Sequence, residues 1–195
     1  MRSGILGGSF DPPHAGHIAL AQTAKIELSL DEVLLVPASR NPHKEAAPRA
    51  SGRDRLRMCS LAVEDEPGLA VCDIEVVRGG YSYTVDTLED LQEVRSADYW
   101  CILGADAVEG FMTWKEPHRI LRLARLAVAA REGQDVVALV AEWDPADRAR
   151  VDTICLPGIP VSSSKVRDQL LRPVPGTIPV PAKVLDYIRE RGLYQ

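Results

Sequence analysis

The chain has 195 residues and a formal net charge of −5, with 46% hydrophobic and 26% charged residues. This length predicts a single domain over residues 1–195, and the composition is typical of a soluble globular protein. The acidic balance argues against nucleic acid as a partner, no apolar stretch is long enough to span a membrane, and the apolar part of the first ten residues is too short for a signal peptide, so we expect a cytoplasmic protein.

Strand-like and helix-like segments alternate along the chain. We predict strands at residues 3–6, 33–37, 99–103, 126–130 and 153–156, an extended segment at 69–77, helices at 16–28, 51–65, 84–94, 117–123, 135–142 and 162–171, and a final helix that contains Val184, Leu185 and Ile188. Apolar strands that alternate with helices predict an α/β fold with a parallel sheet and helices on both faces. Ligands of such folds bind beyond the carboxyl ends of the strands, where the motifs below lie.

The four cysteines are widely spaced and form no CxxC pair. Cys59, Cys72, Cys101 and Cys155 each stand in an apolar stretch. We therefore expect small buried hydrophobic side chains, without a disulfide or a structural metal.

Residues 7–17, GGSFDPPHAGH, carry the strongest functional signal. Glycines without a Cβ let the backbone approach a ligand, and the start of the following helix offers free N–H groups to an anion. His14 and His17 are three residues apart, so they point to one side of that helix, where both can donate hydrogen bonds to phosphate oxygens and either can carry charge near neutral pH. The segment predicts a polyphosphate site, and zinc is disfavoured because no matching ligand set follows.

This segment resembles the GG[ST]FDPxHxGH signature of the nucleotidyltransferases with an HxGH motif, which transfer AMP or CMP between phosphates. The resemblance implies a Rossmann-like, doubly wound parallel sheet. It also implies that His14 and His17 act in catalysis and that the nucleotide contacts Gly7, Gly8, Ser9, Phe10 and Gly16.

Two further strings resemble the nicotinate-nucleotide adenylyltransferases within that superfamily. PHK, residues 42–44, implies that Lys44 binds phosphate, with Arg40 close by. In SYTVDTL, residues 82–88, Thr84 opens a helix whose free N–H groups can receive a carboxylate such as that of nicotinate, while a neutral carboxamide gains less from the helix dipole. The resemblance therefore assigns Arg40, Tyr83, Thr84 and Val85 to substrate binding.

Two later segments complete the predicted site. GADAVEGFMTW, residues 104–114, resembles the GAD…W segment of the family; it implies that Gly104 and Asp106 bind nucleotide and that Trp114 stacks on the pyridine ring. Arg131 matches a family arginine near the adenine and phosphates, although Glu132 replaces the usual proline. VSSSKVR, residues 161–167, resembles [IV]SSTxIR and predicts a second anion cradle of Ser163, Ser164 and Arg167. We assign Lys44 and Arg167 to catalysis together with the two histidines, because they would hold the leaving pyrophosphate.

The resemblance implies adenylyl transfer from ATP to nicotinate mononucleotide in NAD biosynthesis, with Mg²⁺ bound mainly through ATP phosphates and water. Pantetheine phosphate or nicotinamide mononucleotide as the acceptor, a non-catalytic nucleotide sensor and a metal-dependent hydrolase are the alternatives. SYTVDTL and Trp114 count against the first, and retention of both histidines, Lys44 and Arg167 counts against a sensor. The sequence leaves open whether the chain forms a homo-oligomer.

Overall fold

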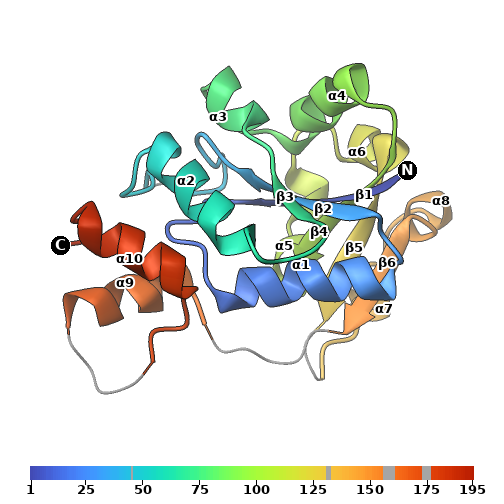
Figure 1. The fold of residues 1–195 in the computed structure, drawn as a ribbon. Coiled ribbons are helices and arrows are strands. Elements are labelled where there is room, and N and C mark those ends of the chain that lie inside the picture. Colours follow the sequence, from blue (N-terminus) through green and yellow to red (C-terminus); the bar gives the residue numbers. More distant parts are fainter. Residues whose placement is uncertain (45, 131–132, 156–160, 173–176) are drawn as a thin grey trace.

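In the computed structural model, six strands form one parallel sheet in the order β3-β2-β1-β4-β5-β6 (Figure 1). The structure describes residues 1–44, 46–130, 133–155, 161–172 and 177–195. The strands are β1 (Arg2–Gly8), β2 (Glu32–Pro37), β3 (Leu69–Val71), β4 (Asp98–Gly104), β5 (Ala124–Ala130) and β6 (Val151–Cys155). This order confirms the predicted doubly wound, Rossmann-like α/β fold.

Helices cover both faces of the sheet, and neighbouring strand residues alternate between them. In β1, Ile5 packs into the core below α4, α5 and α6, whereas Leu6 packs into the core shared with α1 and α2. Burial on both faces explains why the inner strands are continuous apolar runs. The helices are α1 (Ala15–Glu27), α2 (Gly52–Val63), α3 (Ile74–Arg78), α4 (Thr84–Val94), α5 (Ala105–Val108), the 3₁₀ turn η1 (Phe111–Thr113), α6 (Pro117–Leu123), α7 (Val136–Leu139), α8 (Pro145–Arg148), α9 (Ser163–Leu171) and α10 (Ala182–Glu190).

A third core cluster joins α9 and α10 to the main body through α2. Val184 and Ile188 of α10 are buried against Met58 and Ala62 of α2, and Val166 of α9 belongs to the same cluster. Figure 1 shows α10 beside α2, and α9 at the same end of the molecule.

The sequence prediction was wrong for residues 69–77. Only Leu69–Val71 pair with β2, and Ile74–Arg78 form α3. A short apolar run does not by itself distinguish a strand from a buried helical turn, and here the run supplies one edge strand and then a helix packed over β2. The helix predicted at 135–142 is likewise shorter, at Val136–Leu139, and α8 follows it at Pro145–Arg148.

The cysteines only partly match their predicted burial. Cys59 and Cys101 are buried, Cys72 is half-buried, Cys155 is exposed, and all four are free thiols. Cys155 closes the edge strand β6, where one side of the backbone has no neighbouring strand to cover it. Arg131, Leu156 and residues 173–176 of the Pro-rich stretch 173–181 lie outside the described residues.

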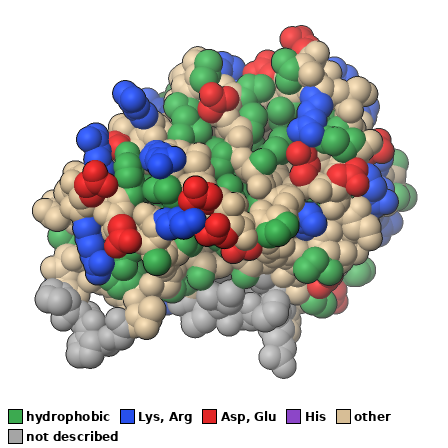
Figure 2. All heavy atoms as spheres, in the orientation of Figure 1, with side chains coloured by type: hydrophobic (Ala, Val, Ile, Leu, Met, Phe, Trp, Pro, Cys, Tyr) green, Lys and Arg blue, Asp and Glu red, His purple; other side chains and the backbone are tan. Residues whose placement is uncertain are grey.

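Two further features concern possible partners and membrane insertion: the distribution of charged side chains on the surface, and the length and hydrophobicity of the helices. Lys and Arg side chains are intermixed with Asp and Glu over the face seen in Figure 2. None of the helices in the described part of the chain combines the length and hydrophobicity that a membrane span requires.

The fold places the predicted motifs at one edge of the sheet. The strand order reverses between β1 and β4, because β1 connects outward to β2 while β4 begins the other half. The carboxyl ends of these two strands, at Gly8 and Gly104, therefore open the crevice in which ligands of such folds bind.

Candidate active site

The backbone leaves β1 through two glycines and a strained turn. A Cβ on Gly7 would meet no heavy atom of the described residues within 4 Å, so the backbone there is open to a ligand. A Cβ on Gly8 would lie 3.1 Å from the ring of Phe10. Phe10 is 1% exposed and has a φ of +47°, in the left-handed region that bulky residues rarely adopt. This turn folds the phenyl ring under the strand end and leaves the peptide groups above it accessible.

The two histidines of the first motif pack against each other at the start of α1. Their ring centroids are 3.6 Å apart with planes inclined by 22°, and Phe10 meets the His17 ring edge-on at 4.8 Å. The backbone N–H of His14 donates to Nδ1 of His17 at 3.1 Å. Because Nδ1 of His17 accepts, the proton of the neutral ring resides on Nε2, where it can donate to a ligand.

Burial keeps both imidazoles neutral at pH 7 in the ligand-free protein. It lowers the pKa of His14 to about 4. It also lowers the pKa of His17 well below its usual value, and the charge of Lys44, together with that of His14 when protonated, lowers that pKa further. A polyphosphate beside the rings would oppose this shift, since a nearby negative charge favours the protonated form.

Cationic and hydroxyl groups surround the histidines in a cleft of about 830 Å³. Nζ of Lys44 lies 3.4 Å from Oγ of Ser9. Arg167 donates to the carbonyl oxygen of Asp11 at 2.6 Å and to Oγ of Ser164 at 3.1 Å. Ser163, at the start of α9, donates to the carbonyl oxygen of Pro12 at 2.9 Å. The first motif and α9 thus form one donor-rich surface suited to phosphate oxygens.

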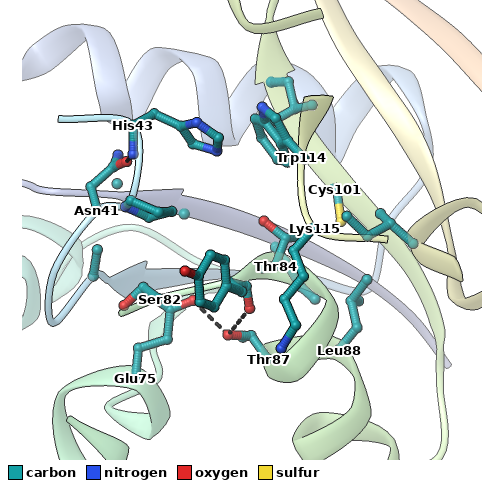
Figure 3. A pocket seen from close by; sticks show the side chains of 18 of the residues that line it. Asn41, His43, Glu75, Ser82, Thr84, Thr87, Leu88, Cys101, Trp114 and Lys115 are labelled. Atoms are coloured by element: carbon teal, nitrogen blue, oxygen red, sulfur yellow. Dashed lines mark hydrogen bonds between the residues drawn. The ribbon is translucent and has the colours of Figure 1, made fainter. Parts of the chain in front are cut away.

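A second, more apolar pocket adjoins this cleft (Figure 3). The ring of His43 stacks on Trp114 with centroids 5.2 Å apart and planes inclined by 27°. Figure 3 shows the two rings facing each other across the pocket mouth, with Thr84 and Lys115 beyond them. Gly7, Gly8 and Asn41 line both the pocket and the cleft, so a ligand can extend from one into the other.

The start of α4 and a lysine–aspartate ion pair lie together at this pocket. Thr84 is the first residue of α4 and Tyr83 is its N-cap. Nζ of Lys115 bonds Oδ1 of Asp86, in the first turn of α4, at 2.7 Å and lies 4.9 Å from the centre of the Tyr83 ring. The free N–H groups of the helix N-terminus favour an anionic ligand group, while Asp86 compensates the ammonium charge in the ligand-free protein.

A buried carboxyl group forms part of the pocket floor. Glu75 is 6% exposed, and Oγ1 of Thr87 donates to its Oε1 at 2.7 Å. Burial raises the pKa of Glu75, while the hydrogen bonds from Thr87 and Ser82 act in the opposite direction. Arg78 donates to the Thr87 hydroxyl at 2.9 Å, which extends the network away from the pocket.

Comparison with known proteins now shows the family to which the chain belongs. The cytidylyltransferase-like family model matches residues 5–169. The chain is 43% identical over 196 residues to a Bordetella petrii protein named "Probable nicotinate-nucleotide adenylyltransferase", covering 100% of this chain and 99% of the other, and 39% identical over 193 residues to a protein of the same name from Roseiflexus sp., covering 98% and 97%. The chain belongs to the nicotinate-nucleotide adenylyltransferase family.

Solved structures agree on the fold. Plasmodium falciparum nicotinic acid mononucleotide adenylyltransferase in complex with NaAD superimposes with a TM-score of 0.75 at 18% identity, over 99% of this chain and 97% of that one. A putative nicotinate-nucleotide adenylyltransferase of Vibrio parahaemolyticus gives 0.68 at 19% identity, over 99% and 94%. The whole adenylyltransferase chain therefore follows the nucleotidyltransferase fold.

Most of the site residues predicted from the sequence line the two cavities of this adenylyltransferase. The cleft is lined by Gly7, Gly8, Ser9, Phe10, His14, His17, Lys44, Ser163, Ser164 and Arg167, and the pocket by Tyr83, Thr84 and Trp114 together with both glycines. Gly16 allows close packing against Val161, because a Cβ at this position would lie 2.8 Å from Cγ1 of Val161.

The other predicted residues lie apart from the described linings of the two cavities. Val85 is buried in the core at 1% exposure, and the guanidinium of Arg40 lies 4.7 Å from the centre of the Tyr81 ring. Gly104 and Asp106 sit where β4 passes into α5, and Gln134 donates to Asp106 at 3.4 Å. Arg131 lies outside the described residues.

Sequence reasoning missed several residues of the adenylyltransferase site. His43, Glu75 and Lys115 line the pocket, and Asp11 lines the cleft. Arg55, 2% exposed, donates to the carbonyl oxygen of Ser9 at 2.8 Å from below. His43 and Asp11 belong to the motifs quoted above, so the sequence could have indicated them. Nothing in the sequence around Arg55 distinguishes it from other residues of α2.

The buried imidazole predicts a pH-dependent stability. The pKa of His14 falls from 6.5 to about 4 on folding, so the unfolded chain takes up the proton first as pH falls. The free energy of unfolding should therefore decline between about pH 6.5 and 4, by about 3 kcal/mol from this group. His14→Asn retains a favoured N-cap residue and should reduce that loss, as measured by urea unfolding at pH 7 and 5. An equal decline in both proteins would contradict the assignment.

Proposed function

We propose that the chain, as a single nucleotidyltransferase domain, transfers the adenylyl group of ATP to nicotinate mononucleotide, releasing pyrophosphate and nicotinate adenine dinucleotide in NAD biosynthesis. One observation carries this proposal: the donor-rich cleft and the aromatic pocket meet at Gly7, Gly8 and Asn41. A triphosphate in the cleft and a pyridine ring in the pocket would bring the two phosphates to be joined to the end of β1.

The reaction requires charge neutralisation more than proton transfer. An oxygen of the mononucleotide phosphate attacks the α-phosphorus of ATP, a new P–O bond forms, and the bond from the α-phosphorus to the bridging oxygen breaks, so pyrophosphate leaves. The attacking phosphate is already ionised at pH 7 and needs no general base. His14 and His17 would donate to the α- and β-phosphate oxygens, with Lys44 and Arg167 on the departing pyrophosphate.

The remaining nucleotide contacts belong to the same proposal. Ser163 and Ser164 at the start of α9 would bind the β- and γ-phosphates, and Gly104, Asp106 and Arg131 would bind the adenosine half. Phe10 and Gly16 shape the cleft, and Ser9 offers its hydroxyl beside Lys44.

Mg²⁺ enters the proposal as part of the ATP substrate. Within the described residues, no cluster of three or more His, Cys, Asp or Glu side chains offers a metal cage. The Asp11 carboxylate, which lines the cleft, already accepts from Arg49, Ala50 and Tyr194. This arrangement fits an ion that is held mainly by phosphate oxygens and water. Such an ion would add positive charge to the triphosphate.

The pocket favours nicotinate over the alternative acceptors. A flat pyridine ring suits the surfaces of Trp114 and His43, whereas a pantetheine chain has no ring to stack. A carboxylate suits the N-terminus of α4 and the nearby Lys115, whereas a carboxamide carries no charge for them. A nucleotide sensor would have no use for the second pocket. Tyr83, Thr84 and Val85 would meet the carboxylate through their backbone, with Arg40 at the loop behind.

The direct test is a substrate panel. Pyrophosphate release is measured with ATP and Mg²⁺ and with nicotinate mononucleotide, nicotinamide mononucleotide or phosphopantetheine. We expect fast release with the first and slow release with the others. Faster release with another acceptor would overturn the substrate assignment. No release with any of the three acceptors would favour a non-catalytic nucleotide sensor.

His17→Ala should nearly abolish turnover, by on the order of 10²–10³-fold, because it removes the Nε2–H donor. The circular dichroism spectrum and the melting temperature should stay close to wild type. His118→Ala is the matched control, since that exposed histidine bonds Asp147 on the α6 and α8 side of the molecule. Near wild-type activity of His17→Ala would refute the mechanism.

Lys115→Gln should raise KM for nicotinate mononucleotide about fivefold, because an exposed charge pair contributes about 1 kcal/mol. KM for nicotinamide mononucleotide should stay unchanged, which lowers the selectivity ratio. Lys183→Gln is the control, since Lys183 also pairs with carboxylates, at Glu64 and Asp65, but lies on α10. A proportional rise for both mononucleotides would argue that Lys115 does not sense the carboxylate.

A further inference from the structure

Three segments around the cleft are tied to one buried carboxylate. Asp11 is 5% exposed, and its Oδ2 and Oδ1 accept from the backbone N–H groups of Arg49 at 2.8 Å and Ala50 at 3.0 Å. Arg167 of α9 donates to its carbonyl oxygen at 2.6 Å and lies 3.7 Å from Oδ2. The first motif, residues 49–50 and α9 therefore take their relative positions from Asp11.

A further donor to Asp11 comes from a residue 183 positions away. The hydroxyl of Tyr194 donates to Oδ1 of Asp11 at 2.8 Å, and the Tyr194 side chain is buried at 8% exposure. Its backbone φ is +66°, a conformation that a bulky residue keeps only where its surroundings enforce it.

Local sequence explains how Tyr194 reaches that position. Gly192 has a φ of +59° and ends α10, with the Gly192 N–H bonded to the carbonyl oxygen of Arg189 and the Leu193 N–H to that of Ile188. This pair of bonds is a Schellman motif, which reverses the chain after the helix. The reversal directs Tyr194 away from the axis of α10 and toward the first motif.

We propose that Tyr194 is a positioning residue of the triphosphate cleft, whose hydroxyl fixes the Asp11 carboxylate and, through it, the Arg167 guanidinium. The inference rests on the proposed function in taking the cleft as the triphosphate site. It adds a residue outside both cavities to the machinery that binds ATP.

The physical reason lies in the balance of contacts around Asp11. Without the Tyr194 hydroxyl, Oδ1 keeps, among the described residues, the donor from Ala50 alone, and a buried carboxylate short of donors turns toward another cation. Arg167 already lies 3.7 Å from the Asp11 carboxylate, and its Nη2 now bonds Ser164 at the cleft. A closer pairing with Asp11 would draw the guanidinium away from the phosphates. Neither Asp11 nor Tyr194 is among the described lining residues of the aromatic pocket, so the mononucleotide pocket should be unaffected.

Tyr194→Phe isolates the effect, because it removes one oxygen and keeps the ring. Titration calorimetry with inorganic tripolyphosphate, ATP and nicotinate mononucleotide gives three dissociation constants for each protein. We expect Kd for tripolyphosphate and ATP to rise about tenfold, as expected from the loss of one hydrogen bond to a charged group, and Kd for nicotinate mononucleotide to stay the same.

Tyr187→Phe is the matched control. The Tyr187 hydroxyl also donates to an aspartate, Asp54, at 2.8 Å, and it stands on α10 beside α2, outside the cleft lining. All three dissociation constants should equal those of the wild type. A tripolyphosphate affinity of Tyr194→Phe equal to wild type, or an equal loss for nicotinate mononucleotide, would overturn the inference, the second because it marks a general structural role.

Two features keep the test decisive. Calorimetry reports the dissociation constant of the folded molecules and gives the folded fraction as the stoichiometry, so a partly folded variant still yields an answer. A wild-type protein that binds neither tripolyphosphate nor ATP would instead refute the proposed function, which separates the two failures.

Discussion

A cleft built for a polyanion must hold its positive groups together when no anion is present, and here a buried carboxylate makes this possible. Asp11 accepts hydrogen bonds from both sides and stands next to the Arg167 guanidinium, so that cation is compensated in the empty protein. The two histidines do not need a compensating negative charge, because burial lowers their pKa values and leaves them uncharged. Lys44 and Arg49 also line the cleft, and their side chains are exposed, so water solvates their charges.

This arrangement suits a reaction in which negative charge shifts during a displacement. Donors that are already oriented need little rearrangement when the charge develops, and in a partly buried cleft they act through a low dielectric. An incoming triphosphate would also raise the pKa values that burial has lowered. A bound triphosphate would thus favour positive charge in the site, while the empty site avoids the cost of holding two buried imidazolium ions.

The parts of the fold that follow local rules could be predicted from the sequence, and the parts that depend on distant contacts could not. Alternating apolar strands and helices gave the correct fold class, and the first motif placed its glycines and histidines in one cleft. The prediction for residues 69–77 was wrong because a short apolar run does not distinguish a strand from a helix. The carboxylate network escaped prediction because its partners are up to 183 residues apart, and no local period marks such a contact.

In the proposed function, separate cavities for the phosphates and for the ring would let chemistry and substrate choice depend on different residues. The cleft groups are close to one another in space but come from the end of β1, the start of α1, the loop after β2 and α9, and they would bind phosphate oxygens. The pocket groups come mainly from the loops after β2 and β4, from α3 and from the start of α4, and they would bind a ring and its charge. Among the described residues, only Gly7, Gly8 and Asn41 line both, so a change at Lys115 or Trp114 would alter which acceptor binds while the proposed displacement at phosphorus proceeds as before. By the same separation, the proposed role of Tyr194 would concern ATP alone, because its hydroxyl bonds Asp11 on the cleft side.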